Sequence, residues 1–166
     1  KTETPEPEKE VSVQETVKEE SIQEPVKTVA VRDTTGKSAL ELKMEELGLV
    51  DIETLTKDIP VSLMYARDDN FTGKVMYHDL TRAYLHPEAA RALLKAQAKL
   101  KSLRPDLTLK VYDAARPMSV QQIMWDVVKD TDKQIYVSNP ARGGGLHNYG
   151  LAVDVTLCDV ATGDTL

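Results

Sequence analysis

Cysteine and aromatic residues are scarce in this sequence, which has one cysteine among 166 residues and 5% aromatic residues. A single thiol excludes both an internal disulfide framework and a zinc knuckle built from paired cysteines. Cys158 is surrounded in the sequence by Val155, Leu157 and Val160. We therefore expect it to be a small buried apolar residue rather than a nucleophile.

Long apolar runs and clusters of basic residues are also missing. No stretch reaches the roughly 18 to 20 apolar residues that cross a bilayer, and the first residues contain no apolar core of a signal peptide. Lysine and arginine are scattered, and the formal net charge is -6, which argues against a nucleic-acid partner. The sequence thus predicts a soluble chain with no membrane-spanning segment.

Residues 1–35 differ in composition from the rest of the chain. They are rich in Glu, Lys, Thr, Val and Pro, and they contain no aromatic residue. Such a segment buries too little apolar surface to offset its ordering entropy, so we predict a disordered acidic tether, with a weak helix at 11–20 as the alternative. A charged tether before a folded domain, 36–166, favours a periplasmic or cell-envelope protein, including one lipid-anchored through a removed leader. A cytoplasmic location is the alternative.

Apolar spacing predicts three helices in the folded part. The first covers 40–47, with Leu47 in its apolar stripe, and the second begins at Pro87, directly after His86. Ser119 is expected to cap the third helix. Its inward-facing residues are expected to be Val120, Ile123, Met124, Val127 and Val128.

Two segments alternate as strands do, 107–113 and 151–157. In the second, Asp154 lies on the face opposite four apolar residues, Leu151, Val153, Val155 and Leu157. An unpaired buried carboxylate costs several kcal/mol, so Asp154 needs a cation, a metal or hydrogen bonds. His147, in a glycine-rich loop just before this strand, can supply an imidazole nitrogen, and the two residues suit half of a tetrahedral zinc site. The alternative is a loop histidine and an aspartate paired with an arginine.

The segment "GLHNYGLAVD" resembles the SxHxxGxAxD signature of the D-alanyl-D-alanine dipeptidases, a family of zinc peptidases. Three further segments, "YARDDNFTG", "AYLHPEAARAL" and "VYDAARP", are similar to family elements in the same order. The resemblance covers roughly residues 49–166.

The resemblance implies one zinc ion, with His147 and Asp154 as two of its three protein ligands. The third ligand and the glutamate general base would lie in an ExxH pair downstream of residue 166, because nothing after Asp154 supplies them. We therefore expect 36–166 to be the N-terminal and central part of the family domain. The chain would be a fragment, or its partner would be a C-terminal fragment of the same protein.

The resemblance also implies roles for residues around the metal. Arg116 matches the arginine that binds the polarised carbonyl oxygen, which a fixed guanidinium can stabilise in the transition state. Asp113 is expected on the substrate side, orienting the loop or the arginine. Asn70 and Phe71 match a substrate-side element, with a plain turn and an anchoring aromatic as the alternative. Gly145 replaces a serine that lies beside the substrate in the family, so we expect broader specificity.

The function implied is zinc-dependent hydrolysis of the dipeptide D-alanyl-D-alanine in cell-wall metabolism, with the 166-residue chain alone inactive. A D,D- or L,D-carboxypeptidase acting on peptidoglycan stem peptides and a noncatalytic peptidoglycan-binding module are the alternatives. The implied fold is α+β, with a central, mostly antiparallel sheet and helices packed on it. The mixture of helical and strand periodicities supports the same class.

Overall fold

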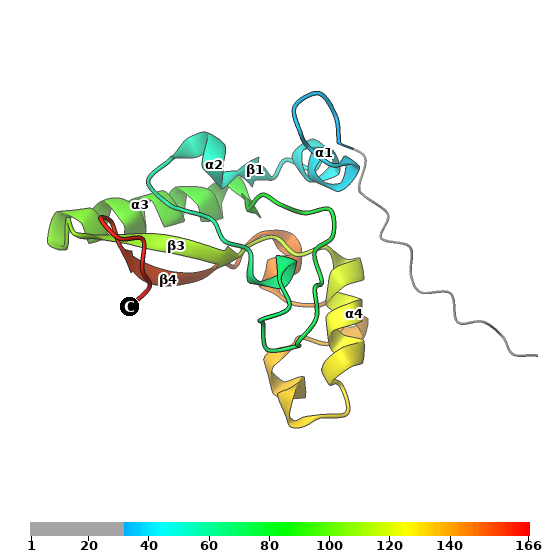
Figure 1. Ribbon diagram of the computed structural model, residues 1–166. Coiled ribbons are helices and arrows are strands. Elements are labelled where there is room, and N and C mark those ends of the chain that lie inside the picture. Colours follow the sequence, from blue (N-terminus) through cyan, green and yellow to red (C-terminus); the bar gives the residue numbers. More distant parts are fainter. Residues whose placement is uncertain (1–31) are drawn as a thin grey trace, which may run out of the picture.

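Residues 32–166 are described by the structure, which is a computed structural model (Figure 1). The predicted tether, except for its last four residues, and the alternative helix at 11–20 lie outside the described residues. The main elements, in chain order, are α1 (Ala39–Glu46), β1 (Val50–Asp51), α2 (Ile52–Leu55), β2 (Tyr84–Leu85), α3 (Pro87–Leu103), β3 (Leu107–Asp113), α4 (Met118–Val128) and β4 (Asp154–Asp159). Short 3-10 helices η1 (Met64–Ala66), η2 (Asp132–Tyr136), η3 (Pro140–Arg142) and η4 (Leu146–Tyr149) occupy the connections.

The α1 helix begins with a reciprocal cap. The Ser38 hydroxyl accepts a hydrogen bond from the Glu41 amide (3.1 Å), and the Glu41 carboxylate accepts one from the Ser38 amide (2.8 Å). Met44 is buried, but the expectation for Leu47 was wrong, since its side chain is 71% exposed. The helix ends at Glu46, so Leu47 lies one residue beyond the stripe that packs on the core.

The α3 helix has the predicted start. Pro87 occupies its first turn, and His86 is the N-cap, with its Nδ1 accepting a hydrogen bond from the Glu88 amide (3.3 Å). The helix packs along β3, where the buried Gln97 donates to the Thr108 hydroxyl (2.8 Å). This bond fixes the strand that leads to the candidate site.

The strands pair antiparallel in two ladders, β1 with β2 and β3 with β4. In the β3–β4 ladder Val111 faces Val155, but the next pair joins Asp113 to Asp154, so Tyr112 is an extra residue on β3. The α+β class and the antiparallel pairing are confirmed. The expected single central sheet is represented, within residues 32–166, by these two short ladders.

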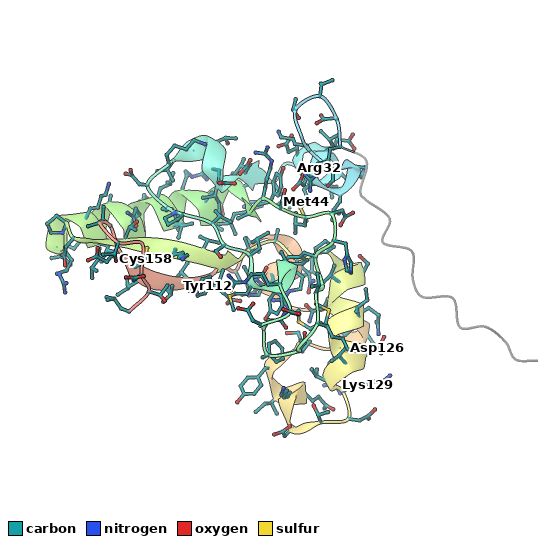
Figure 2. All side chains as sticks on the ribbon, in the orientation of Figure 1. Arg32, Met44, Tyr112, Asp126, Lys129 and Cys158 are labelled. Carbon is teal, nitrogen blue, oxygen red and sulfur yellow. The ribbon has the colours of Figure 1, made fainter. Side chains whose placement is uncertain are left out.

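The β4 strand begins three residues later than predicted, at Asp154. Of the four apolar residues on the face opposite Asp154, Leu151, Val155 and Leu157 are exposed, and Val153 packs against the core. The ladder packs on α3 through β3, and from β4 only Cys158 is fully buried, as predicted for this thiol. Figure 2 shows Cys158 and Tyr112 on this ladder.

The α4 helix differs from the prediction at two positions. It begins at Met118 after Pro117, so Ser119 lies inside its first turn and is not the cap. Ile123 is exposed, and the buried side includes Gln121 instead, beside Val120, Met124 and Val128. The helix is rotated relative to the predicted stripe because Gln121 is drawn inward by polar partners.

Within residues 32–166 no helix combines the length and apolar character needed to span a membrane.

Candidate metal centre

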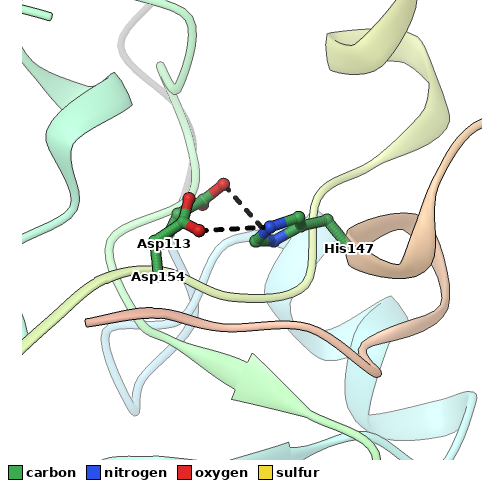
Figure 3. A group of neighbouring side chains, drawn as sticks. All are labelled: Asp113, His147 and Asp154. Atoms are coloured by element: carbon green, nitrogen blue, oxygen red, sulfur yellow. Dashed lines mark ion pairs between the residues drawn. The ribbon is translucent and has the colours of Figure 1, made fainter. Parts of the chain in front are cut away.

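Three side chains that can ligate a metal converge where the β3–β4 ladder meets the glycine-rich loop. Asp113 is the last residue of β3, Asp154 is the first of β4, and His147 lies in η4. One ligand atom from each lies within 4.8 Å of the others. Figure 3 shows the imidazole of His147 pointing at the two carboxylates, which come from adjacent strands. The extra residue in β3 brings the carboxylates together, because it pairs Asp113 directly with Asp154.

The loop before β4 is shaped by glycine at its exit. Gly150 follows η4 with a φ of +66°, a conformation that L-residues rarely adopt. A Cβ there would lie 2.9 Å from the His86 amide nitrogen and from a Leu49 methyl group. The Gly150 carbonyl accepts a hydrogen bond from that same amide (2.8 Å). Glycine is therefore required for the chain to turn from His147 into β4.

The imidazole of His147 is oriented by the backbone. Its Nδ1 lies 2.8 Å from the Ala114 carbonyl, which can only accept, so Nδ1 carries a proton, and in the neutral ring Nε2 is the nitrogen that keeps the lone pair. Nε2 lies 3.5 Å from Oδ1 of Asp154. Burial alone would lower the pKa of His147, but its hydrogen bonds with Asp154 and Ala114 raise the pKa above its ordinary value. The hydrogen bond with His147 in turn lowers the pKa of Asp154.

The Asp113 carboxylate is 1% exposed and already has hydrogen-bond partners on both oxygens. Oδ1 accepts from the Tyr77 hydroxyl (2.6 Å), and Oδ2 accepts from Nε (3.2 Å) and Nη2 (2.5 Å) of Arg116. Its contact with His147 is to Nδ1, at 3.7 Å, on the side away from Nε2. Asp113 is thus placed to orient Arg116 and the histidine.

The guanidinium of Arg116 is held from several sides and is 7% exposed. Besides its pair with Asp113, Nη1 donates to the Gln121 side chain (2.9 Å), and the group lies 5.0 Å from the ring centre of Tyr65 in η1. Burial alone would lower the pKa of Arg116, but the Asp113 carboxylate more than offsets this and raises the pKa, so the group stays cationic. A fixed cation of this kind can stabilise developing negative charge without reorganising.

Asn148 joins the arginine loop to the histidine loop. Its Nδ2 donates to the Arg116 carbonyl (3.0 Å), and its Oδ1 accepts from the Gly145 amide (2.8 Å). The Arg116 amide also donates to the His147 carbonyl (2.9 Å). The cation and the imidazole are therefore parts of one hydrogen-bonded unit.

Asn70 and Phe71 lie in a loop of their own. Nδ2 of Asn70 donates to the Lys74 carbonyl (2.8 Å), and Oδ1 accepts from the Thr72 amide (2.9 Å), so its polar atoms close the loop. The Phe71 ring packs edge-on against Tyr65, with ring centres 6.1 Å apart. Phe71 thereby reaches the surroundings of Arg116, whereas Asn70 shapes the turn.

Four residues of this site were not anticipated from the sequence: Tyr65, Tyr77, Gln121 and Asn148. The sequence carries one usable signal, since Gln121 interrupts the apolar residues of a predicted amphipathic helix. A buried amide on such a helix requires polar partners, which Arg116 and the Ser138 carbonyl provide. Tyr65 and Tyr77 reach the site through the tertiary fold, so no local sequence pattern predicts their position.

Two of the three converging side chains are suitable ligands for a zinc ion. Nε2 of His147 and the carboxylate of Asp154 are nitrogen and oxygen donors of the kind that zinc takes. The Asp154 side chain is 53% exposed, so a ligand or substrate can approach the carboxylate from solvent. The Nδ1 hydrogen bond to Ala114 is the arrangement that fixes the tautomer of metal-binding histidines.

Comparison with known proteins matches residues 45–165 to the peptidase family described as D-Ala-D-Ala dipeptidase. The D-alanyl-D-alanine dipeptidase of Escherichia coli (strain K12) is 36% identical over 113 residues, which cover 67% of this chain and 54% of that protein. The chain spans about half the length of the curated relative it matches.

Proposed function

Because the chain belongs to the D-Ala-D-Ala dipeptidase family, we propose that it hydrolyses D-alanyl-D-alanine in a zinc-dependent reaction. Membership of this peptidase family rests on the match over residues 45–165. D-alanyl-D-alanine is the dipeptide in the name of the relative from E. coli. We extend that substrate to this chain, and with it a role in cell-wall turnover in the envelope.

His147 and Asp154 would hold the zinc ion, through Nε2 and a carboxylate oxygen. Bound zinc supplies polarisation of the scissile carbonyl and a lowered pKa of a water molecule. Catalytic zinc ordinarily has three protein ligands. Residues 32–166 bring three candidate donors together, but both oxygens of Asp113 already accept hydrogen bonds from Tyr77 and Arg116, which leaves His147 and Asp154. We place the third ligand and the general base beyond residue 166, in keeping with the half of the relative's length that the chain spans.

The residues of this chain would contribute orientation and charge. Arg116 would hydrogen-bond the oxygen of the scissile carbonyl as negative charge builds on it. Asp113 would keep the guanidinium in place through two hydrogen bonds, and Tyr65 would support its other face. Ala114 would hold the imidazole so that Nε2 faces Asp154.

The observation that supports this proposal most strongly is the hydrogen-bonded unit of Arg116 and His147. The Arg116 amide bonds the His147 carbonyl, and Asn148 bonds the Arg116 carbonyl. A stabilising cation and a metal-binding nitrogen are thus fixed relative to each other before substrate binds, as transition-state stabilisation requires.

The test is release of D-alanine from D-alanyl-D-alanine by the full-length protein. We expect activity that is lost with a chelator and restored by about one equivalent of zinc per chain. The matched control is Asp126→Ala, which removes an exposed carboxylate on α4 that pairs with Lys129 (3.0 Å) and leaves the site intact. Hydrolysis that persists after complete metal removal would contradict the proposal.

A D,D- or L,D-carboxypeptidase acting on stem peptides is the second candidate. A recess of about 380 Å³ lies next to Arg116, lined by Tyr65, Phe71, Lys133 and Tyr136. Its aromatic walls could take more of a peptide than two alanines. Turnover of a pentapeptide stem at a higher kcat/KM than the free dipeptide would favour this candidate.

A further inference from the structure

The backbone conformation of Gly145 does not require glycine, but the space around it does. Its φ and ψ are -130° and -179°, which is extended backbone that any residue can adopt. A Cβ at this position, however, would lie 2.6 Å from the Ser138 hydroxyl oxygen and 3.2 Å from the Ser138 Cβ. The side chain of Ser138 therefore fills the space in which a side chain at position 145 would begin.

Ser138 is held in this position by the polar network of the site. Its carbonyl accepts a hydrogen bond from Nε2 of Gln121 (2.7 Å), and Gln121 accepts one from Arg116 (2.9 Å). Val137, just before it, is buried. The backbone of Ser138 is thus fixed relative to the arginine, while among residues 32–166 its hydroxyl has no hydrogen-bond partner. A placed hydroxyl of this kind is available to a ligand.

Ser138 is one of the residues that line a cleft of about 420 Å³. Besides Ser138, the lining includes Trp125, Asn139, Arg142 and Gly144. No carboxylate of the described residues lies within ion-pair distance of Arg142, although the chain as a whole carries a net charge of -6. A cleft that offers an unpaired guanidinium and a hydroxyl suits a carboxylate, which accepts hydrogen bonds from both.

We propose that this cleft binds the C-terminal carboxylate of the peptide substrate, with Ser138 donating the hydrogen bond that a side chain at Gly145 would otherwise supply and Arg142 providing the charge. The inference rests on the proposed function, because it takes the substrate to be a small peptide with a free carboxylate. It adds that the specificity for that carboxylate comes from Ser138 and Arg142, which lie outside the family signature. Glycine at position 145 leaves space for the Ser138 hydroxyl.

The test compares D-alanyl-D-alanine with its C-terminal amide, which lacks the carboxylate. Binding to the full-length protein is measured by calorimetry after metal removal, so that no turnover interferes, and KM is measured with zinc restored. Ser138→Ala and Arg142→Gln should each weaken binding of the dipeptide by about tenfold, the effect of one lost hydrogen bond to a charged group. Binding of the amide should change less than about twofold in the same variants.

Moving the serine from position 138 to position 145 tests whether Ser138 takes the place of a side chain at position 145. Ser138→Gly should weaken dipeptide binding as Ser138→Ala does, and adding Gly145→Ser to it should restore affinity to within about twofold of the original. Ser102→Ala, which removes an exposed hydroxyl on α3, is the control and should change nothing. Thermal melting of each variant establishes that it is folded.

Each outcome separates the inference from the proposed function. Unchanged affinity of Ser138→Ala for the dipeptide, or equal losses for the dipeptide and the amide, would overturn the inference even if the protein is an active dipeptidase. Selective loss for the dipeptide in a protein that never hydrolyses it would support the cleft and overturn the proposed function. Absence of any dipeptide binding, with or without zinc, would overturn both.

Discussion

Asp113 and Arg116 form a buried pair in which one carboxylate oxygen accepts hydrogen bonds from both Nε and Nη2 of the guanidinium. The pair lies within a single loop, at the end of β3, and both side chains are almost fully buried. The second carboxylate oxygen is occupied by the Tyr77 hydroxyl. Because a two-point contact fixes a planar guanidinium in direction as well as position, Arg116 is presented in one orientation.

Arg116→Ala in the full-length protein should lower kcat/KM for D-alanyl-D-alanine by about 100-fold to 1,000-fold or more, because it removes stabilisation of the transition state. The zinc content should stay near that of the unaltered protein, because Arg116 is not a ligand. Steady-state kinetics and metal analysis of the same sample check both statements. Near-normal turnover would remove Arg116 from the catalytic machinery.

Asp154→Ala should abolish stable zinc binding, since the site loses one of its two described donors. Metal analysis after dialysis, with Asp126→Ala as the matched loss of an exposed carboxylate, measures the effect. If Asp154→Ala kept its zinc, the alternative in which Asp154 only pairs with a positive group would stand.

Asp113→Asn should reduce activity and stability while sparing the metal. The amide keeps the shape of the carboxylate but leaves the Arg116 charge buried without its counter-ion, a change that typically costs about 3 to 5 kcal/mol. Denaturant unfolding measures the stability and metal analysis the zinc. Loss of zinc by a folded Asp113→Asn protein would show instead that Asp113 is a ligand.

Residues 1–166 alone should bind zinc weakly and release no D-alanine. Of the three donors that converge in the described part, Asp113 is already bonded by Tyr77 and Arg116, which leaves two, and each missing ligand lowers affinity as well as disturbing geometry. Intact mass, zinc titration and a D-alanine release assay on the 166-residue species check this. Robust zinc-dependent hydrolysis by a sample proven to end at Leu166 would show that these residues contain a complete site.

Stability should fall in acid partly through Glu41. Burial alone would raise the pKa of this carboxyl, but hydrogen bonds from Ser38 and Thr81 and the charge of Arg32 lower it below the ordinary value of 4.5. A lowered folded-state pKa means that the contribution is complete above about pH 4.5 and is lost as the pH falls below it. Glu41→Gln should therefore melt at a lower temperature at pH 7, with the difference shrinking below pH 4.5. A difference that does not depend on pH would contradict this account.

The sequence was sufficient for elements whose signals are local. Pro87 after a capping residue defined the start of α3, and strict alternation defined β3. The α+β class followed from these patterns. The neighbourhood of His147 and Asp154 was also accessible, because a loop and the strand that follows it are close by connectivity.

Features that depend on distant partners were not accessible in the same way. Gln121 faces inward because Arg116 and Ser138 bond it. The interruption of the apolar residues marks Gln121 as unusual, but both of its partners lie outside the helix and cannot be predicted from that interruption. Ser119 is a good cap by type, but Pro117 already fixes the backbone one residue before the helix begins. Ser138 has no local sequence signal, since its position against Gly145 arises only in the folded chain.

The extra residue in β3 has a consequence for chain length. Tyr112 is the residue by which β3 exceeds β4 between two paired positions, and in a regular ladder Asp154 would face Tyr112 instead of Asp113. An in-frame deletion of the Tyr112 codon would therefore make the ladder regular and keep Asp113 opposite Asp154, but it would remove the local bend and added twist that the extra residue gives to the strand carrying Asp113. The pairing of the two carboxylates and the direction in which they face His147 are thus separable properties of this strand, because the first depends on register and the second on the bulge.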